Sequence, residues 1–267
     1  MQKTITVTLV ILLPILCKAQ TGTISIDSLN RFFNKLTEPE RYKKENINFM
    51  IMNNISSKSL FFDFLKKKEY KIQEATGKNQ YIQSHIDYII AKEEIDPLLW
   101  KNSDSADSSM AQPNWELMRN KITKKFSRDY ADRTILGAQV RWYGYKKDTI
   151  NLIKCTVEKN DKYGLDTAGF GKAALNNMIY SLIFTNSNDP DILNKAIKWM
   201  GILVTSEPNN ASFIDTYANI LYKAGRDKEA LNWQKRAIIL APDNNEIRET
   251  LIKMERGEPT WPVKKRL

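Results

Sequence analysis

A 34-residue spacing between matching residues is the feature that most constrains the fold of this chain. Three pairs of identical residues keep this spacing: Pro208 and Pro242, Ala196 and Ala230, and Trp199 and Trp233. A fixed period of this length is typical of proteins built from stacked helical hairpins, because one hairpin cannot bury its apolar face alone. The sequence therefore predicts a repeat-bearing, all-helical region.

The best hairpin covers residues 211–244. Its first helix is expected to end at Gly225, since glycine tolerates the positive φ that closes many helices, and Pro242 marks the end of its second helix. The preceding unit covers 177–210. A further helix at 245–256 is predicted to cover the last apolar face, as capping units of such arrays do.

The rest of the chain also shows apolar residues at helical spacing. Ile82, Ile86, Ile89 and Ile90 form one such stripe, and a second one runs through residues 26–36. Further helices are predicted at 40–53, 57–74, 114–127, 128–143 and 148–162. The Ser- and Asp-rich stretch at 102–114 is predicted to be a loop or linker, which separates an N-terminal helical region at 20–101 from repeats at 115–267.

The N-terminus is typical of a secretory signal peptide. Residues 1–19 combine a short positive start with an apolar stretch too short to span a bilayer, and Cys17 and Ala19 are small residues at the cleavage register. Cleavage before Gln20 would export the chain, to the periplasm as the first expectation and to the exterior as another. Lipidation of Cys17 is an alternative. No later stretch is apolar for long enough to predict a membrane span.

The charge of the chain is positive and unevenly spread. The formal net charge of +10 falls to +8 when Lys3 and Lys18 leave with the signal. Residues 111–163 hold 12 basic and 6 acidic side chains, whereas 81–110 hold 2 and 6. Such a balance favours anionic partners, and export argues against nucleic acid as the natural one.

The residues that carry most enzyme chemistry are scarce. His85 is the only histidine, and neither a nucleophile nor a ligand cluster accompanies it. Cys155 would be the only cysteine after cleavage, which excludes an intramolecular disulfide, and its helical pattern favours a small buried side chain. We therefore predict a non-enzymatic protein without a cofactor or metal.

Residues 211–244 resemble the tetratricopeptide (TPR) repeat, a helix–turn–helix unit of this length. The small residues of the family fall on Ala218, Ala230 and Ala237, its turn glycine on Gly225, and its closing proline on Pro242. Ile214 and Gln234 depart from the pattern, and the earlier unit departs from it at Phe184 and Leu203. The resemblance implies a short right-handed solenoid of helical hairpins.

A longer and weaker resemblance covers about residues 81–261. This part is similar to the helical region behind the thioredoxin domain of some exported bacterial thioredoxin-like proteins. The thioredoxin domain and its Cys-x-x-Cys motif are absent from the sequence, so redox chemistry is not implied. The resemblance implies a thioredoxin-like envelope protein as a possible partner.

The TPR resemblance implies protein or peptide binding in a groove lined by the first helix of each repeat. The expected groove residues are Ser212, Asp215, Asn219, Tyr222, Lys223, Met178, Ser181 and Thr185. Two other hypotheses remain open. In the first, the chain is an accessory or degenerate relative of thioredoxin-like oxidoreductases. In the second, it is an electrostatic binder of envelope polyanions.

Overall fold

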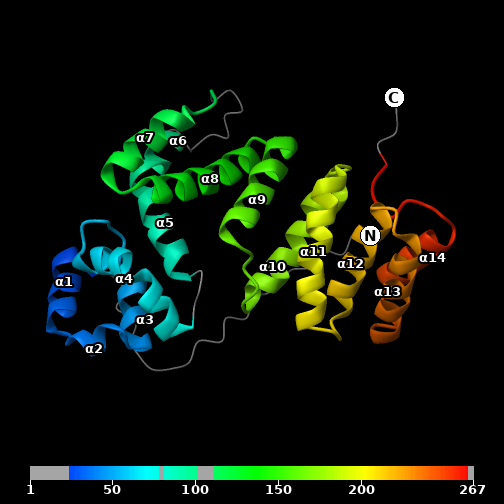
Figure 1. The fold of residues 1–267 in the computed structure, drawn as a ribbon, viewed down its shortest axis with the longest axis horizontal. Coiled ribbons are helices and arrows are strands. Elements are labelled where there is room, and N and C mark those ends of the chain that lie inside the picture. The colour runs from blue at the N-terminus through cyan, green and yellow to red at the C-terminus, as the bar shows by residue number, and fades with distance from the viewer. Residues whose placement is uncertain (1–23, 78–80, 101–110, 264–267) are drawn as a thin grey trace, which may run out of the picture. The chain divides into compact units, whose positions relative to one another are not determined.

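The computed structural model describes residues 24–77, 81–100 and 111–263, which form helices and no strand (Figure 1). The predicted all-helical class is therefore confirmed for this part of the chain. The predicted signal peptide, Cys17 and the cleavage site before Gln20 lie outside the described residues. The chain divides into two compact units, residues 1–68 and 69–267.

The first unit contains α1 (Ile26–Lys35), α2 (Glu38–Arg41), α3 (Lys44–Asn53) and the start of α4 (Leu60–Thr76). The helix predicted at 40–53 is two helices, because the extended conformation of Lys43 interrupts it. Glu40 and Thr37 form a capping box at the start of α2, in which the Glu40 carboxylate accepts hydrogen bonds from the backbone N–H and the hydroxyl of Thr37, at 2.8 and 2.7 Å. The units separate where Lys68 leaves helical geometry within α4.

The first half of the second unit contains α5 (Tyr81–Glu94), α6 (Asp96–Leu99), α7 (Trp115–Lys125), α8 (Arg128–Tyr145) and α9 (Thr149–Tyr163). The predicted isoleucine stripe of α5 is fully buried. Since α5 packs against α7 and α8, helices on both sides of the loop predicted at 102–114 belong to one compact unit. Most of that loop lies outside the described residues.

The acidic segment and the basic segment of the sequence form helices that pack against each other. Ion pairs join the acidic α5 and α6 to the basic α7 and α8: Glu94–Lys121 at 3.0 Å, Glu94–Lys125 at 2.5 Å, Glu93–Lys125 at 3.9 Å, Asp87–Arg133 at 2.7 Å and Asp96–Arg141 at 2.7 Å. Glu94 is buried, and its two lysines lower its pKa against the opposing effect of burial. Basic side chains of α7 and α8 are therefore paired with acids of the neighbouring helices.

The second half of this unit contains α10 (Phe170–Met178), the π-helix η1 (Ile179–Phe184), α11 (Pro190–Ser206), α12 (Ala211–Lys223), α13 (Asp227–Leu240) and α14 (Asn245–Glu255). Packing joins α11 to α12, α12 to α13 and α13 to α14 (Figure 1). The helix α14 stands where a capping helix is predicted. The π-helix was not predicted, since its i→i+5 register has no distinct apolar period.

The alanines that the sequence places at helix contacts of the two predicted repeat units have no exposed surface. Ala196, Ala218, Ala230 and Ala237 are each 0% exposed, and Gly225 has the positive φ expected at the end of α12. Trp199 is buried, and Trp233 lies against Tyr217 with ring centroids 5.2 Å apart. These positions agree with closely packed hairpins. In the described residues no helix is long and apolar enough to cross a membrane.

Candidate functional site

The eight residues predicted to line a groove do not form one open surface. Asn219 and Tyr222 are buried, with exposed fractions of 2% and 8%. The amide of Asn219 donates to the backbone carbonyl of Asp215 at 3.0 Å and to its carboxylate at 3.3 Å. Asn219 therefore supports α12 from within, whereas the prediction placed it on the ligand-facing surface.

The remaining predicted residues lie at or near the surface. Ser212 and Ser181 are exposed, and Met178 is half-buried against the core. The hydroxyls of Ser181 and Thr185 donate to backbone carbonyls of their own segment, those of Asn177 and Tyr180, at 2.6 and 3.0 Å. The two residues that belong to larger polar arrangements are Asp215 and Lys223.

Asp215 is a largely buried carboxylate held by amides. Gln234, which has no exposed surface, donates its amide to Asp215 at 2.6 Å and to the backbone carbonyl of Ile247 at 3.0 Å. One amide thus ties α12, α13 and α14 together, at a position where the TPR pattern favours an aromatic residue. Burial raises the pKa of Asp215 to about 6, and the charge of Glu246 adds to this rise, while the two amide donors oppose it.

Replacing Asp215 with asparagine is expected to increase stability at pH 7.5 by about 1–2 kcal/mol. The folded-state pKa of about 6 lies above the ordinary value of 3.8, so the native protein loses stability as pH rises from about 4 through about 6. The rise of the pKa from 3.8 to about 6 corresponds to at most about 3 kcal/mol of stability, and the lost carboxylate acceptor offsets part of this gain. Urea unfolding at pH 4 and 7.5 measures the difference.

The matched control for this variant is Asp243→Asn, at an exposed position in the turn before α14. This change should shift stability by no more than about 0.5 kcal/mol at either pH. An Asp215→Asn protein that is destabilised equally at both pH values would show that the hydrogen bonds of Asp215, and not its buried charge, dominate its contribution.

Lys223 ends α12 as a half-buried cation. Its ammonium donates to the backbone carbonyl of Phe184 at 2.5 Å and lies 5.6 Å from the ring centroid of Phe184 and 5.5 Å from that of Trp261. Burial lowers its pKa. Among the described residues no carboxylate forms an ion pair with it, so its charge is balanced only by a carbonyl dipole and two aromatic faces.

A pocket of about 420 Å³ opens beside Lys223 and is called the Lys223 pocket below. Its walls come from the start of α9, the helical turn and loop after η1, the end of α12 and the segment after α14. The lining residues are Thr149, Ile150, Ile153, Thr185, Asn186, Asn188, Lys223, Trp261, Pro262 and Val263. It brings together two predicted residues, Thr185 and Lys223, with eight that the sequence did not indicate.

Trp261 reaches this pocket because the chain after α14 returns to α12. Its ring contacts Phe184 edge-on, with centroids 6.4 Å apart, and lies 6.0 Å from the ring of Tyr222. Trp261 stands outside the repeat register, so no period could have placed it there. It covers Tyr222, which accounts for the burial of that predicted groove residue.

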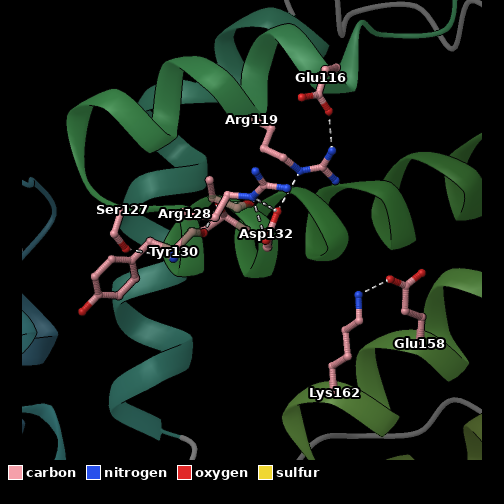
Figure 2. Close-up of polar contacts among 10 residues, drawn as sticks. Glu116, Arg119, Ser127, Arg128, Tyr130, Asp132, Glu158 and Lys162 are labelled. Atoms are coloured by element: carbon pink, nitrogen blue, oxygen red, sulfur yellow. Dashed lines mark hydrogen bonds and ion pairs between the residues drawn. The ribbon is translucent and has the colours of Figure 1, made fainter.

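A second, charged groove runs between α8 and α9 and has a volume of about 390 Å³. Arg119 of α7 and Arg128 of α8 face each other over Asp132, while Glu158 and Lys162 lie on α9 (Figure 2). The other lining residues are Leu136, Gln139, Tyr143, Asn151, Lys154 and Cys155. We call this the Arg119–Arg128 groove.

The two residues most often associated with catalysis are both kept uncharged by burial. Burial lowers the pKa of His85 to about 4, and burial raises the pKa of the Cys155 thiol, so neither an imidazolium nor a thiolate is favoured at neutral pH. The described residues contain no group of three or more His, Cys, Asp or Glu side chains placed to hold a metal ion.

Comparison with protein-family models, with curated proteins and with solved structures found no match to this chain. The similarities to the TPR repeat and to the helical region of thioredoxin-like proteins therefore remain predictions from the sequence.

Proposed function

We propose that this chain is a binding protein without catalytic activity and that it holds a peptide segment of a protein partner in the Lys223 pocket. The observation that carries this proposal is a half-buried ammonium with no carboxylate partner among the described residues, set in the wall of an open pocket. A buried cation without a counter-charge is costly, and a ligand oxygen placed beside it recovers part of that cost.

The chemistry of the pocket suits a peptide. An ammonium has three N–H donors, and one of those of Lys223 is used by the Phe184 carbonyl, which leaves two for a peptide carbonyl or carboxylate. Ile150 and Val263 supply apolar surface, with exposed fractions of 82% and 67%. A pocket with apolar walls and a few convergent polar groups is typical of ligand sites, and a peptide presents both kinds of group.

The π-helix gives this proposal further support. It ends at Phe184, whose carbonyl accepts from Lys223, and Thr185 and Asn186 of the pocket follow directly. The amide of Asn186 donates to the carbonyls of Ser181 and Leu182, at 3.2 and 3.0 Å, which fixes its side chain against the helical turn that carries it. Segments of π-helix are rare in proteins and frequently occur at functional sites.

The setting of this binding is proposed to be the cell envelope, because the N-terminal sequence predicts export. A thioredoxin-like envelope protein is one candidate partner, on the sequence resemblance alone. The hypothesis of polyanion binding over an extended basic surface is less favoured, since many of the basic side chains of α7 and α8 pair with acids of α5 and α6. No structural observation favours the oxidoreductase-related hypothesis.

Lys223→Met is expected to weaken peptide binding about tenfold, because it removes one charge-assisted hydrogen bond while keeping the length of the side chain. A random peptide library displayed on phage is selected against the purified chain, and the enriched peptides are measured by fluorescence polarisation. Ile150→Asp, which places a charge on the apolar wall, should weaken the same peptides. The predicted groove residue Asn219 is not substituted in this test, because its side chain is buried.

Lys198→Met is the matched control, because Lys198 is an exposed lysine of α11 away from the pocket lining. Its affinity for the selected peptides should stay within about twofold of the original, since it removes the same charge without a pocket contact. Enriched peptides that bind the Lys223→Met and Ile150→Asp proteins as tightly as the original would place the binding surface elsewhere.

A further inference from the structure

The Arg119–Arg128 groove holds two guanidinium groups that share a single carboxylate. Nε of Arg119 lies 2.8 Å from one oxygen of Asp132, and Nε of Arg128 lies 3.0 Å from the other (Figure 2). Two like charges are thus held close together by one acid. Glu116 also contacts Arg119, so the charges of this pair balance, and the positive charge in excess within the groove is that of Lys154. What the arginines add is outer guanidinium donors that the two acids do not use.

The outer nitrogens of these guanidiniums are only partly used. Nη1 of Arg119 contacts Glu116 at 2.6 Å, whereas the Nη2 of Arg119 and both Nη atoms of Arg128 have no partner among the described residues. Arg128 is 70% exposed at its side chain, so its free N–H groups are accessible. A planar guanidinium with free outer donors is suited to the oxygens of a phosphate or carboxylate.

The charge balance of the whole groove is also positive. Its lining contains four basic side chains, Arg119, Arg128, Lys154 and Lys162, and two acidic ones, Asp132 and Glu158. Lys162 pairs with Glu158 at 2.6 Å, while Lys154 forms no ion pair in the described part of the chain. One positive charge remains even when Glu116 at the rim is counted. The cluster around Glu94 has no such excess, because its two lysines pair with two acids, Glu94 and its neighbour Glu93.

We propose that the Arg119–Arg128 groove binds the phosphate group of a small molecule. A phosphate monoester carries about −1.5 to −2 charges at pH 7, which suits several cations around one position better than a single carboxylate does. The groove volume of about 390 Å³ leaves room for an organic part of the ligand. Leu136 and Cys155, both buried, lie beneath it, and Gln139, Tyr143 and Asn151 line the end next to the α8–α9 turn.

This proposal is independent of peptide binding at the Lys223 pocket. The helix α9 contributes to both sites, but it does so through different residues: Thr149, Ile150 and Ile153 line the Lys223 pocket, while Asn151, Lys154 and Glu158 line the groove. A variant in one site can therefore be tested without changing the lining of the other.

The test uses inorganic pyrophosphate as a compact probe, titrated into the purified chain by isothermal calorimetry at low ionic strength. We expect saturable binding with one site per chain. Arg128→Gln should weaken it about tenfold, since it removes the unpaired guanidinium donors, and Lys154→Gln should weaken it less because an exposed ammonium is better solvated. In thermal melts, pyrophosphate should raise the Tm of the original protein and not that of the Arg128→Gln protein.

Lys124→Gln is the control, because Lys124 is an exposed lysine of α7 that does not line the groove. It removes one positive charge, as Lys154→Gln does, and should leave the affinity within about twofold. The proposal is overturned if pyrophosphate shows no saturable binding, or if Lys124→Gln weakens it as much as Arg128→Gln. It is also overturned if the chain sediments with vesicles of anionic phospholipid but does not bind pyrophosphate, since the positive charge would then serve a lipid surface.

Discussion

Replacing Arg133 with methionine is expected to lower the free energy of unfolding by about 3–5 kcal/mol, because it leaves a largely buried carboxylate without its cation. Arg133 is only 6% exposed, and its Nε donates to both oxygens of Asp87, at 2.8 and 2.7 Å. Burial raises the pKa of Asp87 to about 6 even with Arg133 beside it. The attraction of this pair therefore offsets only part of the cost of burying the acid.

The pH dependence of this loss has a defined sign. In the original protein Asp87 is charged above its folded-state pKa of about 6, and Arg133 and Lys159 both act to lower that pKa. Without Arg133 the pKa of Asp87 rises further, so the native variant must keep the group protonated or bear its unpaired charge. The destabilisation should accordingly be larger at pH 8 than at pH 5, as measured by urea unfolding at both values.

A double variant separates the ion pair from its surroundings. Asp87→Leu combined with Arg133→Met removes both charges, and a well-packed apolar pair often matches or exceeds the stability of a buried ion pair. The double variant should therefore be more stable than Arg133→Met alone. A single variant that loses less than about 1 kcal/mol, or a double variant that recovers nothing, would contradict this account of the Asp87–Arg133 pair.

Replacing Ala230 with leucine is expected to lower the free energy of unfolding by about 1–3 kcal/mol, through overpacking. Ala230 lies on α13 with no exposed surface, and α13 packs closely against α12, where Ala218 is equally buried. The added methylenes have no open space to enter, so the two helices must move apart or the new side chain must adopt a strained rotamer. Thermal melting and urea unfolding both measure the loss.

The control for this variant is Ala173→Leu, at an exposed alanine of α10. A leucine there extends into solvent and should shift stability by no more than about 0.5 kcal/mol. An Ala230→Leu protein with an unchanged melting curve would mean that the spacing of the hairpins tolerates a large residue. The 34-residue register would then have to be assigned differently.

The starts of α8 and α9 were predicted well because a capping residue marks each of them. The helix predicted at 128–143 is α8, which begins at Arg128 after the hydroxyl of Ser127 caps it, and the helix predicted at 148–162 is α9, capped by Asp148. The break between α2 and α3 was missed. Its signal lies in the backbone of Lys43, a residue type that is compatible with a helix interior.

The candidate sites could be predicted only in part. Lys223 and Thr185 were predicted as site residues from their positions in the two repeat units, and both line a pocket. Trp261 and Ile150 were missed because they come from segments outside the repeat register, and Asn219 was placed on the surface because a period does not specify how deeply a helix face is buried. Burial depends on which helix covers which, and that is a long-range property.

The sequence by itself determined the helical class, the positions of many helices, including the helix α14 after the last predicted repeat, and the buried alanines of α11, α12 and α13. These features depend on apolar period, on capping residues and on small side chains, which act within one or two turns of the chain. Only the tertiary structure decided that the basic residues of α7 and α8 meet the acids of α5 and α6, and that Trp261 closes the wall beside Lys223. Charge pairing and pocket formation join residues far apart in the chain, and no local pattern records which of many possible partners becomes the neighbour in space.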